Sequence, residues 1–335
     1  MRVGVVGSVA LVAALALPVG AQEAAEPHGS GSVPLTAWGD PDLRGLWTSA
    51  TLTSLERPRA LGEQSELSNL EAAALEEQTA SRRAQADGSS PPGSVGGYNQ
   101  FWLDAGTTVT DSLRTSLIVD PADGRIPWLP QAKIDNDLER ARYGVGPYDS
   151  WEDLDTGERC ITDGLPNMVP IQPYNMNFHI FQTRKWIAIL HEMYHEVRIV
   201  PLDDRPLLPS SAVQWLGDAR GRWEGDTLVI ETSNFADKTD LVWSSPWRAS
   251  RPGFRLVERL TRVDDETIDY RFTVEDRNRF DRVWTVVAPL TTDQASRGVT
   301  SGHLFEYACH EGNRAVANIL RGARAVERAS SSDRD

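Results

Sequence analysis

The chain has 335 residues, and its 48 Asp and Glu outnumber its 34 Lys and Arg, which gives a net charge of −14 at pH 7. This length is enough for one large domain, or two modest ones, with a proper hydrophobic core. An acidic chain without a basic stripe repels phosphate backbones, so the composition argues against nucleic acid as a partner.

The N-terminus has the parts of a secretory signal peptide. Arg2 is followed by an apolar run at 3–17 and by the small-x-small cleavage site Val19-Gly20-Ala21. The run is shorter than the roughly 20 residues that a spanning helix needs, which favours cleavage after Ala21 over a membrane anchor. We therefore expect a periplasmic or secreted protein that does not contact the membrane after cleavage.

The composition divides the chain into four parts. These are a signal peptide at 1–21, a flexible linker at 22–37, a single mainly β domain at 38–328 with a helical N-terminal elaboration, and a disordered tail at 329–335. No internal repeat indicates a second copy of any unit.

Three helices are predicted. The first begins at the capping box Ser68-Asn69-Leu70-Glu71 and runs to about Arg83. The second spans 131–143 and stops at a glycine, and the third spans about 314–326. A long flexible loop rich in Gly, Ser and Pro is expected at 87–97.

The remaining pattern predicts strands. Apolar and polar residues alternate with a period of two over 268–275, and this stretch pairs naturally with 255–263 across an acidic turn. Further strands are predicted at 115–119, 177–200 (two or three strands), 212–233 (a hairpin turning at 224–226), 282–288 and 304–309. Consecutive antiparallel strands with tight turns predict a lipocalin-like meander, either an antiparallel barrel or a strongly curved sheet.

The two cysteines, Cys160 and Cys309, are expected to form a disulfide, because an isolated pair in an oxidising compartment most often does so. The bridge would close a long loop and stabilise the fold by roughly 4–5 kcal/mol in the chain-entropy model.

Several short motifs spread over most of the mature chain resemble those of an uncharacterised family of exported bacterial proteins. They are Asp42-Leu43-Arg44-Gly45-Leu46-Trp47, Arg125-Ile126-Pro127, Gly157-Glu158-Arg159-Cys160, Trp223-Glu224-Gly225-Asp226-Thr227-Leu228-Val229 and Glu306-Tyr307-Ala308-Cys309-His310-Glu311-Gly312-Asn313. The resemblance implies no established activity. In that family an Asn commonly stands at the position of His191, which implies that the family does not depend on a two-histidine zinc site.

The segment His191-Glu192-Met193-Tyr194-His195 spells H-E-x-x-H, the signature of zinc hydrolases. In those enzymes a helical turn brings both imidazoles to one metal. The surrounding residues at 185–201 are β-branched and aromatic and predict one strand, or two strands meeting in a turn. On one extended strand the two histidines would lie roughly 13 Å apart, so we expect no cofactor. A zinc metallohydrolase with His191 and His195 as ligands and Glu192 as base is the alternative.

The same segment supplies the candidate catalytic residues His195, Glu192, Glu196 and Arg198. Arg198 would orient an anionic ligand, and a Glu or the His would act as acid or base. An exposed face with a cross-strand ion pair is the competing interpretation. Tyr194, within the segment, and His179, on the preceding strand, are expected to lie near the ligand.

Two further regions are candidates for ligand contact. The hairpin at 212–233 mixes aromatic and charged groups in Trp215, Asp218 and Trp223, and aromatic platforms bind sugars and other flat ligands. His310 and Glu311 precede the last predicted helix, where they form either a polar site or a helix cap with the nearby Asn313.

No phosphate loop, nucleophile elbow or dinucleotide fingerprint occurs in the sequence, so ATP-, NAD- and serine-hydrolase functions are disfavoured. We expect an exported protein that binds a small organic ligand, a sugar derivative or an aromatic compound, in a β cavity. Cofactor-free acid–base chemistry of a lyase, isomerase or hydrolase would suit its residues. An interaction module without chemistry is the third alternative.

Overall fold

The computed structural model describes residues 33–86, 106–142, 145–169, 174–236, 246–248, 253–295 and 302–332. The predicted signal peptide at 1–21, most of the predicted linker at 22–37 and the predicted loop at 87–97 lie outside these residues.

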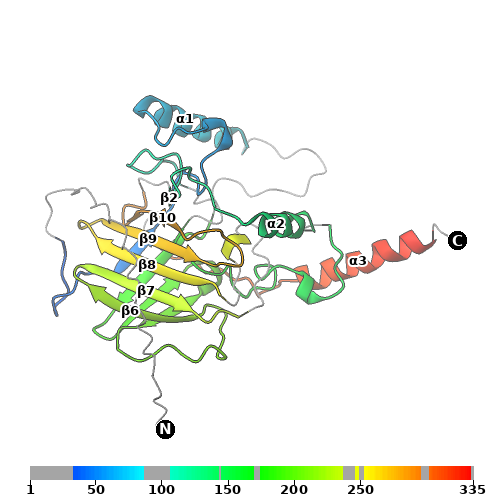
Figure 1. Cartoon of the computed structure of the whole chain (residues 1–335). Helices are drawn as coiled ribbons and strands as arrows, with labels where there is room; N and C mark the ends of the chain where they lie inside the picture. Colours follow the sequence, from blue (N-terminus) through cyan, green and yellow to red (C-terminus); the bar gives the residue numbers. More distant parts are fainter. Residues whose placement is uncertain are drawn as a thin grey trace, which may run out of the picture.

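Eleven strands form one antiparallel sheet in the described part of the chain, accompanied by three α-helices (Figure 1). The strands are β1 (Gly45–Thr48), β2 (Ile118–Asp120), β3 (Asn177–Gln182), β4 (Trp186–His191), β5 (Val197–Pro201), β6 (Asp218–Glu224), β7 (Thr227–Ser233), β8 (Arg255–Arg262), β9 (Thr267–Glu275), β10 (Trp284–Val287) and β11 (Leu290–Thr291). The helices are α1 (Asn69–Ala86), α2 (Pro130–Arg142) and α3 (Ala315–Ser332). The prediction of a mainly β antiparallel fold is confirmed.

The strand order shows where the predicted meander holds. Along the sheet the order is β5-β4-β3-β1-β11-β9-β8-β7-β6, and β10 pairs with both β9 and β2. The runs β3 to β5 and β6 to β9 are each a meander, as the alternation and the turn residues predicted. A meander through the whole sheet is wrong, because β1, from the start of the domain, lies between β3 and β11.

The alternating pattern at β9 produces the core. β8 and β9 pair over their length without a register shift. Ile268, Tyr270, Phe272 and Val274 on β9 are fully buried, whereas the residues between them keep partial exposure. Because alternate residues of a strand point to opposite faces, one face of this hairpin packs into the hydrophobic core.

The sheet curls until strands from its two ends face each other. Arg198 on β5 forms an ion pair of 2.6 Å with Glu258 on β8, and it donates a 2.5 Å hydrogen bond to Thr232 on β7. Tyr270 on β9 donates to the Glu258 carboxylate at 2.8 Å. All four side chains are buried, so the concave face of the sheet encloses a polar network as well as hydrocarbon.

The two edge strands approach each other without joining. A Cβ atom at Gly221 on β6 would lie 2.6 Å from a methyl carbon of Leu202 and 2.9 Å from one of Val200, at the end of β5. No backbone ladder joins β5 to β6 among the described residues. The sheet is therefore strongly curved but open, and the alternative prediction of a closed antiparallel barrel is wrong.

The helices follow their predictions closely, with differences at the C-terminus. At the capping box of α1, the Ser68 N–H donates to the Glu71 carboxylate at 2.7 Å and the Glu71 N–H donates to Ser68 Oγ at 3.3 Å. α3 continues to Ser332, into the stretch that was expected to be a disordered tail. No described helix is long and apolar enough to cross a membrane.

The predicted strand at 304–309 is wrong, because this stretch has no ladder partner among the described strands. The N–H of Phe305 donates instead to the carboxylate of Glu192 at 2.5 Å. A side-chain acceptor has replaced the backbone acceptor that a neighbouring strand would supply.

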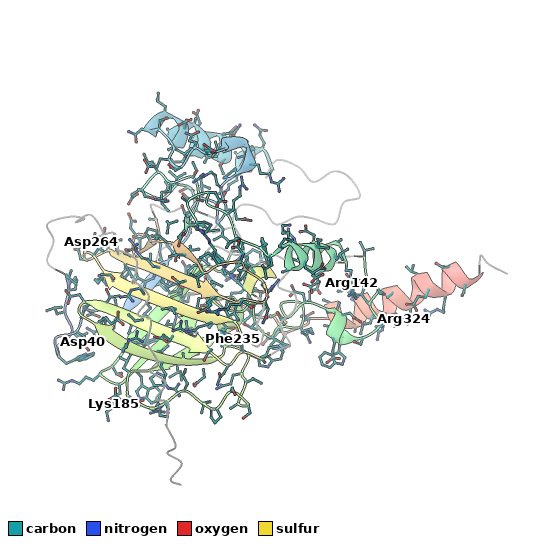
Figure 2. The ribbon with its side chains drawn as sticks, in the orientation of Figure 1. Asp40, Arg142, Lys185, Phe235, Asp264 and Arg324 are labelled. Carbon is teal, nitrogen blue, oxygen red and sulfur yellow. A yellow bond between two sulfur atoms is a disulfide. The ribbon has the colours of Figure 1, made fainter. Side chains whose placement is uncertain are left out.

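Covalent and ionic contacts hold the C-terminal segment to the domain. The predicted disulfide between Cys160 and Cys309 is confirmed, with its Cα atoms 5.7 Å apart. Arg324 on α3 and Arg142 at the end of α2 both pair with the loop at 148–153 (Figure 2). The loop that precedes β3 is thus tied to α2, to α3 and to the segment before α3.

The Arg198–Glu258 pair predicts a specific stability pattern. Arg198→Met leaves the Glu258 carboxylate buried without its cation, so we expect a loss of about 3–5 kcal/mol in the free energy of unfolding. Arg198→Met/Glu258→Gln removes the charge and keeps an acceptor for Tyr270, so it should recover at least half of that loss. Urea unfolding followed by Trp fluorescence measures both variants, and equal stability of the two would contradict the buried-charge argument.

Candidate functional site

The H-E-x-x-H segment is a turn between two strands. β4 ends at His191, Met193–His195 forms a single 3₁₀ turn, and β5 begins at Val197. Tyr194 and His195 have φ values of 57° and 41°, in the left-handed region that non-glycine residues seldom adopt. Of the two interpretations of this segment, two strands meeting in a turn is therefore the one confirmed.

This geometry contradicts the alternative of a helical zinc motif. The segment carries no α-helical turn to align the imidazoles, and His191 is buried whereas His195 is exposed. Within the described ranges, no three His, Cys, Asp or Glu side chains are grouped so that they could hold a metal ion. The strand-forming residues on both sides of the motif explain why its spacing does not produce a helix.

The turn instead contributes to a group of buried ionisable side chains, which we call the buried cluster: Asp163, His191, Tyr194, Glu196 and Arg248. They come from the loop before β3, the end of β4, the β4–β5 turn and the short 3₁₀ turn Pro246–Arg248. Because the end of β4 and the turn are continuous, three separate parts of the chain converge on one site.

Glu196 is the acid with the most neutral pKa in the buried cluster. Its carboxylate accepts hydrogen bonds from the Thr162 hydroxyl and, at 2.7 Å, from the Asn167 amide. Although the residue keeps partial exposure, protein atoms surround its carboxyl group. This burial raises the pKa of Glu196 from 4.5 to about 7, and the negative charge of Asp163 raises it further, against the two hydrogen bonds.

Asp163 is a second acid with a raised pKa. Burial raises the pKa of its carboxyl from 3.8 to about 6, while the positive charge of Arg248 and a bond from Tyr194 oppose the shift. The Tyr194 hydroxyl donates to Oδ1 at 3.4 Å, and Oδ2 has no hydrogen-bond partner among the described residues. Burial also raises the pKa of Tyr194, so its hydroxyl stays a proton donor at neutral pH.

His191 is a neutral imidazole. It stacks on Phe178 with ring centroids 6.4 Å apart, and its Nε2 has no partner within the described part of the chain. Burial lowers the pKa of His191 from 6.5 to about 4, backbone bonds at Met193 and Asn167 oppose the shift, and the charge of Arg248 adds to it. A neutral imidazole with a free ring nitrogen offers a proton donor or acceptor to a ligand.

Arg248 supplies the positive charge of the buried cluster. Its side chain is buried, and the guanidinium lies 4.9 Å from the ring centroid of Trp247. Burial lowers the pKa of Arg248 to about 9, well below its usual range, and the charges of Asp163, Tyr270 and Glu196 oppose this shift. The group is therefore still a cation at neutral pH.

The C-terminal segment covers the same region. Tyr307 packs edge-on against Tyr194 with ring centroids 4.8 Å apart. Glu192, two residues before Tyr194, accepts the N–H of Phe305 and, at 3.3 Å, that of Asn177. Glu192 thus joins β3 to the C-terminal segment, while the disulfide joins that segment to the loop that carries Asp163.

The other predicted catalytic residues lie elsewhere. His195 is exposed in the turn, and Arg198 is paired with Glu258. Of the catalytic candidates, only Glu196 belongs to the buried cluster, and Glu192 lies at its border.

The predicted ligand-binding residues are mostly dispersed. His179 stacks on the exposed Phe181 with ring centroids 4.1 Å apart, on the other side of β3 from the buried Phe178. Asp218 pairs with Arg220 at 2.6 Å and accepts the Leu208 N–H at 2.7 Å. Trp215 and Trp223, from the same region, are half-buried, and Trp223 packs against the hydrophobic core.

His310 and Glu311 are exposed before α3. Of the two interpretations of this region, the helix cap has direct support, because Asn313 Oδ1 accepts the Ala315 N–H at 2.9 Å at the start of α3.

Sequence reasoning missed the residues that complete the buried cluster. Asp163 and Thr162 stand in a loop three and two residues after Cys160, and Arg248 stands between segments without a regular pattern. The only signal for the loop was the resemblance motif that ends at Cys160. No pattern marked Arg248 as different from an exposed arginine.

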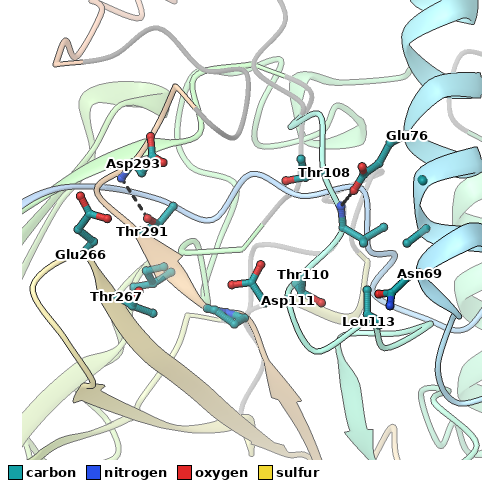
Figure 3. Close-up of a pocket in the computed structure, with 15 residues that line it drawn as sticks. Asn69, Glu76, Thr108, Thr110, Asp111, Leu113, Glu266, Thr267, Thr291 and Asp293 are labelled. Atoms are coloured by element: carbon teal, nitrogen blue, oxygen red, sulfur yellow. Dashed lines mark hydrogen bonds between the residues drawn. The ribbon is translucent and has the colours of Figure 1, made fainter. Parts of the chain in front are cut away.

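A separate concavity lies between α1 and the ends of β9 and β11 (Figure 3). Its volume is about 480 Å³, and its acidic lining residues are Glu76, Asp111, Glu266 and Asp293. None of its described lining residues is Lys, Arg or His. Because this pocket lacks a cation and a neutral base, the buried cluster is the stronger candidate for chemistry.

Comparison with protein-family models, with curated proteins and with solved structures finds no match to this chain.

The raised pKa of Glu196 predicts a pH dependence of stability. The folded-state pKa of Glu196 lies above the value of about 4.5 for a free Glu. The contribution of Glu196 to the free energy of unfolding is therefore fully present below pH 4.5 and is lost as the pH rises through 7. As the pH rises from 5 to 8, the free energy of unfolding of Glu196→Gln should increase relative to that of the wild type. We expect this increase to be on the order of 2 kcal/mol, after allowance for the partial exposure of Glu196.

Urea unfolding of both proteins at several pH values measures this gain. His191 contributes with the opposite sign, because its lowered pKa makes it lose stability as the pH falls from 6.5 towards 4. Because both proteins contain His191, its contribution cancels when the free energy of unfolding of Glu196→Gln is compared with that of the wild type. A difference between the two free energies that does not change with pH would contradict the raised pKa of Glu196.

Proposed function

We propose that this chain is an exported protein, periplasmic or secreted, that binds a small organic ligand at the buried cluster and carries out cofactor-free acid–base chemistry on it. The observation that carries the proposal is the convergence of two carboxyls whose pKa values are about 6 and 7 with a neutral imidazole and a cation. Perturbed ionisable groups of this kind are typical of active sites.

The chemistry follows from the protonation states. A carboxyl with a pKa near 7 is about half protonated at neutral pH, so Glu196 can both donate and accept a proton. Asp163 Oδ2 and His191 Nε2 have no described hydrogen-bond partner, and buried polar atoms almost always have one. Polar groups of a ligand would satisfy these atoms, which supports a lyase, isomerase or hydrolase type of reaction.

The compartment rests on two observations. The disulfide between Cys160 and Cys309 is compatible with an oxidising compartment, and the first residues have the pattern of a signal peptide. Sugar derivatives and aromatic compounds remain the proposed ligand classes, because tryptophan is abundant and Trp247 contacts a member of the buried cluster.

A ligand screen tests the proposal. We expect at least one member of a panel of sugars, sugar acids and aromatic compounds to shift the Trp fluorescence of the mature protein and to raise its Tm. Glu196→Ala should weaken the binding of that ligand by about tenfold or more, because the hydrogen bond between the carboxyl group and the ligand is lost. Glu77→Ala, which changes an exposed glutamate of α1, is the matched control and should bind the ligand as the wild type does.

No response to any compound, or equal affinity in Glu196→Ala and wild type, would contradict the proposed site. In the first case, an interaction module without chemistry becomes the better explanation of the fold.

A further inference from the structure

Arg248 differs from the buried Arg57, Arg198 and Arg262 in that no described residue accepts a hydrogen bond from its side chain. Its side chain is 1 % exposed, and Nε, Nη1 and Nη2 have no hydrogen-bond partner in the described part of the chain. A guanidinium carries five N–H donors, and a buried charge without hydrogen bonds is strongly unfavourable. A partner from outside the chain would remove this penalty.

Three other buried arginines show how the fold satisfies such a group when its role is structural. Arg57 donates to Thr115 at 3.0 Å and to a backbone carbonyl at 2.9 Å. Arg198 pairs through Nη2 with the Glu258 carboxylate and the Thr232 hydroxyl, although its Nε and Nη1 have no partner within the described ranges, and Arg262 donates to three backbone carbonyls. Each of these arginines thus has protein acceptors, whereas all three nitrogens of Arg248 lack one among the described residues.

The guanidinium of Arg248 is held in place by aromatic packing. It lies over Trp247, which stacks on Phe272 with centroids 5.9 Å apart and meets Trp284 edge-on at 5.1 Å. A planar guanidinium fixed in this way presents a preorganised fork that matches a carboxylate.

The neighbouring charges select the kind of anion. Asp163 and Glu196 act on Arg248 through space, but no nitrogen of Arg248 is hydrogen-bonded to either carboxylate in the described structure. One guanidinium neutralises one negative charge, so a dianion such as phosphate would meet two acidic side chains without compensation. A single carboxylate can instead accept hydrogen bonds from Asp163 and Glu196 in their protonated forms.

We propose that Arg248 binds the carboxylate of a small organic acid, which is the ligand of the buried cluster, with Glu196 and Asp163 as proton-donating neighbours. The inference rests on the proposed function and narrows it to acidic members of the two ligand classes, such as uronic acids and aromatic acids. The other ionisable groups around the site are His191 and Tyr194, with Asp155 and Tyr307 next to Tyr194. Arg198, Glu258 and Tyr270 form the neighbouring charged network.

Proton uptake should accompany binding. A bound carboxylate favours the protonated forms of Glu196 and Asp163, whose pKa values in the free protein are about 7 and about 6. The Kd should therefore rise with pH between 6 and 8, by up to about tenfold per pH unit for one proton. His191, with a pKa of about 4, stays neutral over this range and does not contribute.

The experiment uses matched pairs of probes on the mature full chain, measured by calorimetry and Trp fluorescence: benzoate with benzamide, glucuronate with glucose, and inorganic phosphate as a separate anion. We expect the carboxylate of at least one pair to bind about tenfold tighter than its neutral partner. The preference should disappear in Arg248→Met and persist in Arg277→Met, whose side chain is 92 % exposed.

Arg248→Met should keep its fold, because replacing an unpartnered buried charge by an apolar side chain of similar volume is often neutral or stabilising. If it does not fold, Arg248→Lys and the pH dependence of the wild-type Kd decide instead. A weakened carboxylate preference in Arg248→Lys and a Kd that rises with pH support the proposal, whereas wild-type preference and a constant Kd overturn it.

The remaining outcomes separate the two proposals. Neutral probes that bind as tightly as carboxylates, with their binding still weakened in Glu196→Ala, would overturn the role of Arg248 and leave the proposed function standing. Phosphate bound in preference to both carboxylates would overturn the carboxylate class. If no probe of either class binds, both proposals fail.

Discussion

The ion pair between Arg198 and Glu258 is the contact on which the shape of the sheet depends. β5 and β8 stand far apart in the strand order, so the pair can form only if the sheet curls across the distance between them. Each charge would be very unfavourable if buried alone, and together with Thr232 and Tyr270 they form a network inside the sheet. Curvature and electrostatics are therefore linked in this fold.

The curl also determines where the functional groups lie. The β4–β5 turn follows directly on one side of the network, because Arg198 is only two residues beyond Glu196. Glu196 and His191 flank this turn, and the hydrogen bonds that Thr162 and Asn167 donate to Glu196 hold the loop with Asp163 against it. The buried cluster is thus assembled from loops and strand ends that the curved sheet holds at a fixed separation.

Desolvation is the first cause of every large pKa shift in the buried cluster, and it acts on both acids and on the cation. With Arg248 charged, the group is neutral when Asp163 and Glu196 together hold one proton. Because their pKa values are about 6 and 7, this condition is met close to neutral pH. When an anion binds, Asp163 or Glu196 can then take up a proton, so that the site does not keep a net buried charge.

Much of the sheet could be predicted from the sequence, because alternation at 268–275 and the turn residues at 224–226 are local signals. The short strand β1 could not, since its place between β3 and β11 depends on contacts distant in sequence. The H-E-x-x-H motif identified the turn that carries Glu196, although for a chemistry that this turn does not support. Arg248 was missed because burial of an arginine is rare and no local pattern reveals it.

The contrast between Arg198 and Arg248 separates structure from function within one molecule. Both are buried cations, yet Arg198 is neutralised by Glu258, and Arg248 keeps three nitrogens without a partner. Selection for stability alone would remove the second arrangement, because an apolar residue there is often no less stable. Natural proteins keep such local violations mainly at functional sites, with the rest of the fold offsetting them. The acids with raised pKa values lie beside the same arginine, so the unfavourable features of this fold concentrate at one site, where a bound carboxylate would relieve them together.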